Sequence, residues 1–326
     1  MERIEDMKIL LLDSITLGDD IDLSQLEKLG QVIKFSTSTP EEVMTRMKDV
    51  NPDVAIINKI VMSDKVMAAA PALKMVAETA TGYNNIDIAY AKEHGIRVCN
   101  VAGYSTQSVV QHTFALMFYL LEKLPYYDEY VKSGAYIESP CFTHFDKVFH
   151  ELAGKTWGII GLGNIGRGVA SVAAAFGCKV VYYSASGHAY DVPYERVELD
   201  ELLGESDILS IHAPLNQYTE NLINYENLCK MKKSSLLINV GRGQIVNDAD
   251  LVRALNEDVI AGAGLDVMSR EPIERDNPLN TIKDSSKLIV TPHIAWATFE
   301  ARTRLMDEVY ENICAFERNE ERNVIA

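Results

Sequence analysis

A glycine-rich run, Gly161-Leu162-Gly163-Asn164-Ile165-Gly166, lies near the middle of the chain, between an apolar strand-like stretch (156–160) and a helix-like stretch (167–176). In a turn between a strand and a helix, the first glycine permits the tight bend. The second lets a pyrophosphate approach the backbone, and the third allows the helix to pack closely on the strand. The N–H groups and the positive dipole end of the helix favour an anion. The run predicts a dinucleotide site, with a purely structural turn as the alternative.

The overall composition limits the classes of protein to which the chain can belong. Of its 326 residues, 47% are hydrophobic and 24% are charged, which is typical of a globular protein with room for two domains. The formal net charge of −16 argues against nucleic-acid or membrane partners, because both require a basic face. The five cysteines have no C-x-x-C spacing, so we expect no disulfides and no metal site. With neither a leader nor a membrane-spanning apolar run, the sequence predicts a cytoplasmic protein.

Two series of short β-rich runs alternate with helix-compatible stretches. The first series comprises 8–12, 54–57, 73–77 and 97–100, and the second comprises 156–160, 179–183, 207–211, 235–239, 260–265 and 287–290. Each series predicts a parallel sheet covered by helices. The six strands of the second match a doubly wound dinucleotide domain.

We therefore expect an α/β protein with two Rossmann-like domains. A doubly wound cofactor domain of residues 102–293 is inserted in a smaller, flavodoxin-like substrate domain of residues 1–101 and 294–326. The final helix has one apolar face and is too short to form a domain alone, so we expect it to pack on the N-terminal domain. A helix is predicted over 105–124, and the stretch 125–151 has many aromatic residues. Together they predict a dimerisation arm over about 105–151, with a local cap over the protein's own cleft as the alternative.

Three polar residues stand just past the ends of the last predicted strands: Arg242, Glu271 and His293. Ligands bind at this edge of an open parallel sheet. Arginine has a planar fork that matches a carboxylate, histidine exchanges a proton near neutral pH, and a neighbouring carboxylate favours the imidazolium. Together they would bind a 2-oxo acid, protonate its carbonyl and allow it to accept a hydride. Each residue alone could be structural.

The order and spacing of these motifs resemble the D-2-hydroxyacid dehydrogenase family over nearly the whole chain. The resemblance depends on the glycine run, 239–243, 264–267, Glu271-Pro272 and Thr291-Pro292-His293. It implies that Arg242 holds and polarises the 2-oxo acid, that His293 is the acid/base, and that Glu271 raises the basicity of His293. It further implies that Thr81, Gly82 and Tyr83 bind the substrate carboxylate and that Trp296 lies in the pocket wall. The implied cofactor-binding residues are Gly161, Gly163, Asn164, Ile165, Gly166, Ser184, Ala213, Pro214, Thr219, Val240, Gly241 and Asp266, the last as ligand of the nicotinamide carboxamide.

Within the family, the segments 80–85, 103–106, 111–113 and 293–297 are similar to the glycerate dehydrogenase, or hydroxypyruvate reductase, branch. This similarity implies interconversion of hydroxypyruvate and D-glycerate by a homodimer. Dehydrogenases of other 2-oxo acids, lactate-like or phosphoglycerate-like, and a dinucleotide-sensing, corepressor-like scaffold remain alternatives. His112 could reach the substrate, although a buried helix histidine is the simpler interpretation.

The predicted ribose end of the cofactor site departs from the family pattern. Ser184 replaces the acidic residue that would repel a 2′-phosphate, yet no Lys or Arg lies between Tyr182 and Glu195 to bind one. We expect NAD as the cofactor, with NADP also possible.

Overall fold

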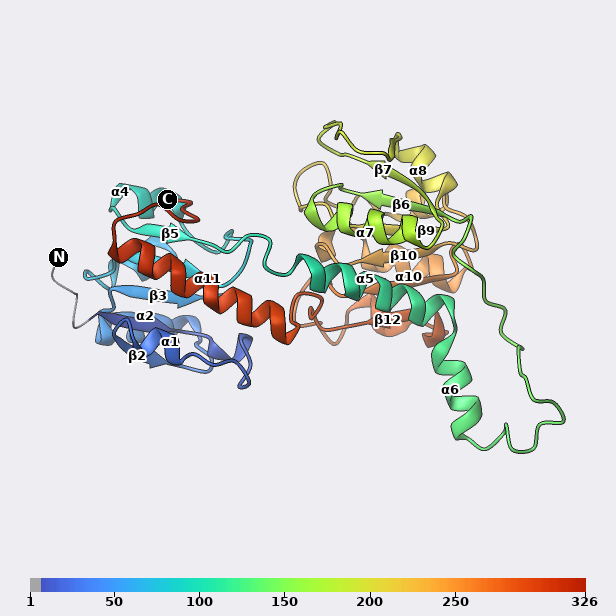
Figure 1. Cartoon of the computed structure of the whole chain (residues 1–326), viewed down its shortest axis with the longest axis horizontal. Coiled ribbons are helices and arrows are strands. Elements are labelled where there is room, and N and C mark those ends of the chain that lie inside the picture. The colour runs from blue at the N-terminus through green and yellow to red at the C-terminus, as the bar shows by residue number, and fades with distance from the viewer. Residues whose placement is uncertain (1–6) are drawn as a thin grey trace. The chain divides into compact units, whose positions relative to one another are not determined.

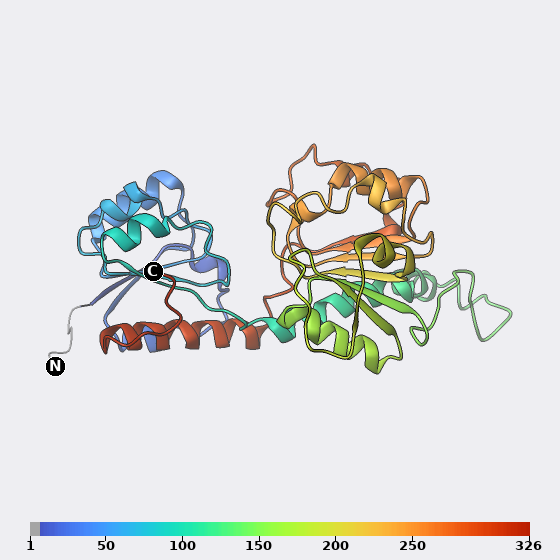
Figure 2. The same cartoon turned by 90° about the horizontal axis from the view of Figure 1, so that it is seen from above.

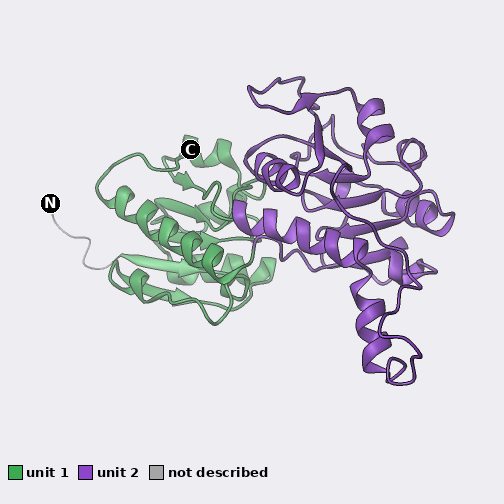
Figure 3. Ribbon diagram, turned by 45° about the vertical axis from the view of Figure 1, so that its right-hand side comes forward, with its two compact units in different colours: residues 1–105, 297–326 green, residues 106–296 purple. Residues whose placement is uncertain are grey.

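The computed structural model describes residues 7–326, which form two compact units (Figures 1 and 3). The first unit comprises the described residues up to 105 together with 297–326, and the second comprises 106–296. Each unit contains one parallel sheet with helices on both faces (Figure 2). The predicted fold class, an α/β protein with two parallel sheets, is confirmed.

The first unit has a five-stranded sheet of order β2-β1-β3-β4-β5. All four pairings are parallel. Four of the strands match predicted runs, whereas β2 was not predicted because it has no fully buried residue. The strands are β1 (Lys8–Leu11), β2 (Gln31–Lys34), β3 (Val54–Ile57), β4 (Met75–Glu78) and β5 (Arg97–Cys99).

The helices of the first unit include the last helix of the chain, α11 (Phe299–Glu317), which packs against β4. Its buried apolar residues include Ala301, Leu305, Val309 and Ile313, which form one face at a spacing of four residues. The expected packing of this helix on the N-terminal sheet is therefore confirmed. The other helices of this unit are η1 (Ser14–Thr16), α1 (Ser24–Glu27), α2 (Pro40–Val50), α3 (Asp64–Ala68) and α4 (Ile88–Glu93).

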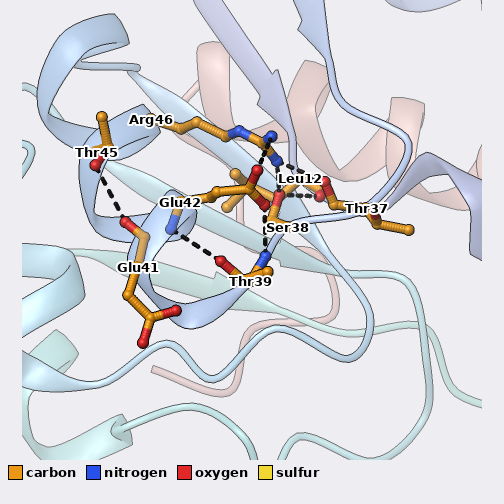
Figure 4. Close-up of polar contacts among 8 residues, drawn as sticks. All are labelled: Leu12, Thr37, Ser38, Thr39, Glu41, Glu42, Thr45 and Arg46. Carbon is orange, nitrogen blue, oxygen red and sulfur yellow. Dashed lines mark hydrogen bonds and ion pairs between the residues drawn. The ribbon is translucent and has the colours of Figure 1, made fainter.

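The start of α2 shows how side chains fix a helix boundary in this unit (Figure 4). The Thr39 hydroxyl accepts from the Glu42 amide at 3.3 Å, and the Glu42 carboxylate accepts from the Thr39 amide at 2.8 Å. Arg46, one turn further on, donates to the Thr37 carbonyl and the Ser38 hydroxyl. These contacts satisfy amides that a helix start leaves without partners, and they attach the helix to the loop after β2.

The second unit has a seven-stranded sheet of order β12-β11-β10-β9-β6-β7-β8. The strand order reverses between β6 and β9, and ligands bind at such a switch point in open α/β sheets. Six strands match predicted runs, and the two-residue edge strand β8 is the seventh. The strands are β6 (Thr156–Ile160), β7 (Lys179–Tyr183), β8 (Glu195–Arg196), β9 (Ile208–Ile211), β10 (Leu236–Asn239), β11 (Gly262–Leu265) and β12 (Leu288–Val290).

Alternating residues of this sheet belong to two hydrophobic cores, one on each face. Ile208 and Leu236 lie in the core that contains α5 (Thr106–Leu121) and α7 (Asn164–Ala175). Leu209 and Leu237 lie in the core that contains α8 (Leu199–Glu205) and α10 (Asp248–Asn256). The helices of this unit are α5 (Thr106–Leu121), α6 (Leu124–Lys132), α7 (Asn164–Ala175), α8 (Leu199–Glu205), α9 (Tyr225–Leu228), η2 (Gly243–Ile245), α10 (Asp248–Asn256), η3 (Pro278–Thr281) and η4 (Ser285–Lys287).

The helix predicted over 105–124 is confirmed as α5, which begins at Thr106 and ends at Leu121. Lys123 then adopts a left-handed backbone with φ of 54° before α6 begins. Pro125 sits in the first turn of α6, where its missing N–H costs no hydrogen bond. No helix within residues 7–326 is long and apolar enough to cross a membrane. All five cysteines are free thiols.

Candidate active site

Three loops leave neighbouring strands at the same level of the second sheet. The pairing Asn239↔Leu265 joins the ends of β10 and β11, and Leu265↔Val290 joins the ends of β11 and β12. Because these strands are parallel, the loops that follow them emerge at one edge. These loops carry Arg242, Glu271 and His293, so the register brings the three predicted catalytic residues to a common edge.

The turn that carries Arg242 is held by the buried side chain of Asn239. Its amide donates to the Arg242 carbonyl at 3.0 Å, and its oxygen accepts from the Gly241 amide at 3.0 Å. A side chain at Gly243 would collide with the backbone of Met268, so the turn lies directly against the segment that leads to Glu271. Arg242 itself is exposed, and its guanidinium donates to the Gly241 carbonyl at 2.9 Å. The remaining donors of its fork can bind a carboxylate.

His293 and Glu271 form a close pair in which Nδ1 of the imidazole lies 2.6 Å from Oε2 of the carboxylate. The other carboxylate oxygen of Glu271 accepts from the Met268 amide at 3.2 Å. His293 has a left-handed backbone, with φ of 55°, which is uncommon for a residue with a side chain. Such backbones persist where surrounding contacts determine them, and they are concentrated at active sites.

The geometry of this pair determines where a proton can be exchanged. An ionised carboxylate only accepts hydrogen bonds, so the Nδ1 atom of His293 carries a hydrogen that it donates to Glu271. The Nε2 atom is then the ring nitrogen that is left to exchange a proton with a ligand. The pair can therefore support proton transfer at Nε2. The side chains of His293 and Glu271 are 29% and 27% exposed, so a ligand can reach them.

The glycine run after β6 fits a dinucleotide pyrophosphate. Gly161 has φ of 91°, and a Cβ there would lie 2.7 Å from the backbone of Ala213. A Cβ at Gly166 would collide with the Gly161 carbonyl, so the third glycine allows the close packing of α7. By contrast, no described atom lies within 4 Å of a Cβ at Gly163. Gly163 is the N-cap of α7 and makes no side-chain cap hydrogen bond. The first amides of the helix, which include those of Asn164 and Ile165, are therefore left for an anion.

The predicted ribose and adenosine residues follow β7 and β9, on either side of the glycine run. Ser184 is buried, and its hydroxyl lies 3.2 Å from that of Ser186. Thr219 is also buried and donates to the Pro214 carbonyl at 2.7 Å, so it shapes the loop after Ala213. Burial lowers the pKa of His212, at the start of this loop, to about 3. The ring is therefore neutral at physiological pH and adds no cation here.

Asp266, which follows β11, is buried, and its carboxylate binds protein donors. It accepts from the Ile294 amide and the Ala295 amide, each at 2.8 Å, and from the Thr291 hydroxyl at 2.6 Å. Val240 is buried beside Gly241 at the end of β10. Sequence reasoning missed the structural roles of Asn239 and Thr291. The polar Asn239 at the end of an otherwise apolar strand was the one available signal.

Other predicted residues lie elsewhere in the two units. In the first unit, the Thr81 carbonyl accepts from the Asn100 side chain at 2.7 Å, which fixes the loop that also contains Gly82 and the exposed Tyr83. In the second, Trp296 is partly buried against the core of α5 and α7. Within residues 7–326, no group of three His, Cys, Asp or Glu side chains could hold a metal ion.

Comparison with known proteins assigns the chain to a family. Residues 114–295 match the family model of the D-isomer specific 2-hydroxyacid dehydrogenase, NAD binding domain. The chain is 40% identical to a hydroxypyruvate reductase from Blautia hydrogenotrophica over 325 residues, covering 98% of this chain and 99% of the relative. It is 39% identical to a glycerate dehydrogenase from Methylorubrum extorquens over 292 residues, covering 89% and 90%.

A solved structure with the same fold is that of an NADPH-dependent glyoxylate/hydroxypyruvate reductase from Sinorhizobium meliloti, in complex with NADP and malonate. It matches with a TM-score of 0.81 at 27% identity and covers 100% of this chain and 97% of that one. The family match covers more than half of the chain, and the relatives match over most of their length. The chain therefore belongs to the D-isomer specific 2-hydroxyacid dehydrogenases, the NAD(P)-dependent oxidoreductases that reduce 2-oxo acids.

Proposed function

We propose that this enzyme interconverts hydroxypyruvate and D-glycerate, with NADH as the preferred reductant. The observation that carries the proposal is the 2.6 Å contact between His293 Nδ1 and Glu271 Oε2 at the same sheet edge as Arg242. The similarity to a named hydroxypyruvate reductase and a named glycerate dehydrogenase favours this substrate pair. With its pyrophosphate on the glycine run, a bound NADH would supply a hydride for reduction, and NAD would accept one for oxidation.

Each side chain has a separate task in this proposal. The Arg242 fork binds the carboxylate of the 2-oxo acid and polarises its carbonyl. When the carbonyl carbon gains a hydride, its oxygen takes the proton from His293 Nε2. Glu271 accepts the hydrogen of Nδ1 and so holds the ring with Nε2 facing the substrate. The backbone amides of Thr81, Gly82 and Tyr83 are proposed as further carboxylate donors, because amides at a glycine turn suit an anion.

A panel of 2-oxo acids tests the choice of substrate. Hydroxypyruvate, glyoxylate, pyruvate and a phosphorylated 2-oxo acid are compared by kcat/KM with NADH. We expect hydroxypyruvate to rank first, and a higher rank for any of the others would replace it as the substrate. A dinucleotide-sensing scaffold is the second candidate function. Under that alternative NADH would bind, but none of the acids would cause its oxidation.

We expect the enzyme to prefer NADH over NADPH by only a modest margin, because the ribose end of the site distinguishes the two cofactors weakly. Ser184 and Ser186 offer hydroxyls but no carboxylate to repel a 2′-phosphate. Although the segment itself has no Lys or Arg, α7 supplies a cation, since the Arg167 guanidinium lies 5.6 Å from the centre of the Tyr190 ring. This arrangement is compatible with use of both cofactors. Initial rates with saturating hydroxypyruvate and varied NADH or NADPH measure the margin.

We further propose a cytoplasmic homodimer that uses the arm of residues 105–151. After α6, the arm has four highly exposed apolar side chains, namely Ile137 (82%), Phe142 (88%), Phe145 (71%) and Val148 (71%). Large exposed apolar groups of this kind indicate a protein interface. Light scattering after size exclusion should give twice the chain mass, and Phe142→Ser with Phe145→Ser should shift it to the monomer. A wild-type monomer would favour the local cap instead.

A further inference from the structure

The carboxylate of Asp266 holds the chain on both sides of His293. Before it, the Thr291 hydroxyl donates to Asp266 Oδ1 at 2.6 Å. After it, the Ile294 amide donates to Oδ1 and the Ala295 amide to Oδ2, each at 2.8 Å. The His293 amide donates to the Asp266 carbonyl, also at 2.8 Å. One buried residue thus fixes the whole turn that carries the proton donor.

This anchoring explains how His293 keeps its left-handed backbone. A residue with a Cβ rarely adopts φ of 55°, and the surrounding hydrogen bonds must favour that conformation over the alternatives. The conformation directs Nδ1 at Glu271, with Nε2 on the other side of the ring. The position of the reacting nitrogen therefore depends on how firmly Asp266 is itself held.

His112 of α5 completes this set of contacts. Its Nε2 atom lies 2.9 Å from the Thr291 hydroxyl and 3.5 Å from Asp266 Oδ1, and its side chain is 19% exposed. The Thr291 hydroxyl has one hydrogen, and the carboxylate can only accept. Because that hydrogen goes to Asp266, the hydroxyl must accept from His112, which fixes the hydrogen of His112 on Nε2. The donor sequence runs from His112 to Thr291 and on to Asp266.

We propose that His112 is a positioning residue for the reaction, acting through Thr291 and Asp266 on the placement of His293. The inference rests on the proposed role of His293 as proton donor. Without the Nε2 donor of His112, the Thr291 hydroxyl has no donor for its lone pair, and the buried carboxylate of Asp266 loses a polar neighbour. Both changes loosen the turn that carries His293, because a buried polar group needs its partners.

The kinetic test compares variants that keep or remove the donor. His112→Gln places an amide N–H near the position of Nε2, whereas His112→Leu has no donor. We expect His112→Leu to lower kcat for hydroxypyruvate about 10- to 100-fold with little change in KM, because a displacement of about 1 Å has effects of this size. His112→Gln should recover most of the rate. His150→Leu, an exposed histidine of the arm, is the matched control and should behave as wild type.

A double-mutant cycle separates this role from direct substrate contact. Thr291→Val removes the hydroxyl with little change in shape, so it should lower kcat as His112→Leu does. The two changes together should cost no more than either alone, since both break one sequence of bonds. Additive losses, an unchanged kcat in His112→Leu, or a raised KM with unchanged kcat would each overturn the proposal. Melting temperatures confirm that the variants fold.

An NMR measurement tests the inference without catalysis. In protein labelled with ¹⁵N-histidine, the signal of His293 is assigned by its loss in His293→Ala. The ring-nitrogen shifts of His293 should change in His112→Leu and Thr291→Val and stay close to wild type in His112→Gln. Unchanged shifts in all three would overturn the positioning role. If no 2-oxo acid oxidises NADH, the proposed function fails, but the NMR measurement still decides whether His112 controls the position of His293.

Discussion

A buried acid in the first unit predicts an unusual dependence of folding on pH. Glu78, the last residue of β4, is 1% exposed, and its Oε1 atom has no hydrogen-bond partner among the described residues. Burial raises the pKa of Glu78 from the ordinary 4.5 to about 8, and the charge of Asp13 adds to the rise. The hydrogen bond that Asn85 donates to Oε2 at 3.0 Å and the charge of Lys59 only partly oppose it.

The direction in which stability changes with pH depends on which state, folded or unfolded, keeps the proton on Glu78. Below pH 4.5, both the folded and the unfolded chain carry the proton on Glu78, and the full stability is present. Between pH 4.5 and about 8, the unfolded chain ionises while the folded protein keeps the proton, so stability falls as pH rises. At about 1.4 kcal/mol for each pH unit, the loss reaches roughly 5 kcal/mol and levels off above pH 8. This loss is a large fraction of an ordinary folding free energy.

The variant Glu78→Gln keeps the shape of the side chain but cannot ionise. Hydrogen exchange of the β3 and β4 amides, corrected for the intrinsic rate at each pH, gives the free energy of opening. Wild type should lose several kcal/mol between pH 5 and 9, and Glu78→Gln should show a much flatter profile. Glu93→Gln changes an exposed carboxyl of the same unit and should keep the wild-type slope. Parallel profiles for wild type and Glu78→Gln would show that Glu78 does not ionise at a raised pKa in the folded protein.

The site itself gives three further predictions. Arg242→Lys should raise KM for the 2-oxo acid and lower kcat, because a point charge cannot reproduce the planar fork; steady-state kinetics that gave the wild-type KM would exclude Arg242 as carboxylate ligand. Glu271→Gln should lower kcat for reduction, because a neutral amide holds the Nδ1 hydrogen of His293 less firmly than a carboxylate does; an unchanged kcat would contradict the His–Glu pairing. Ser184→Asp should widen the preference for NADH over NADPH, because it places a carboxylate where a 2′-phosphate would bind; kcat/KM with both cofactors measures this, and an unchanged ratio would place the ribose elsewhere.

Most of the fold could be predicted because its strands are apolar and buried on both sides. Strand 54–57 is a continuous hydrophobic run, and strand 236–239 is hydrophobic up to Asn239, which is typical of a parallel sheet covered by helices. The two strands that were missed, β2 and β8, are edge strands with polar or exposed residues and lack that pattern.

The contacts of the site were less predictable than its residue types. Arg242, Glu271 and His293 could be named from their places after strands and from the family pattern. The bonds from His112 to Thr291 and from Thr291 to Asp266 join residues far apart in sequence, so they depend on how α5 packs on the sheet. No local periodicity encodes such a contact. The left-handed backbone of His293 likewise depends on tertiary hydrogen bonds.

The most direct test of His293 as proton donor is the oxidation of NADH by hydroxypyruvate, followed through NADH absorbance, in wild type and His293→Ala. We expect turnover by wild type and a loss of roughly 10²- to 10⁴-fold in the variant, because general acid catalysis contributes about that much. Binding of NADH, measured by fluorescence, should be retained because the glycine run is untouched. A His293→Ala enzyme that kept the wild-type rate and pH profile would contradict the assignment of His293 as proton donor.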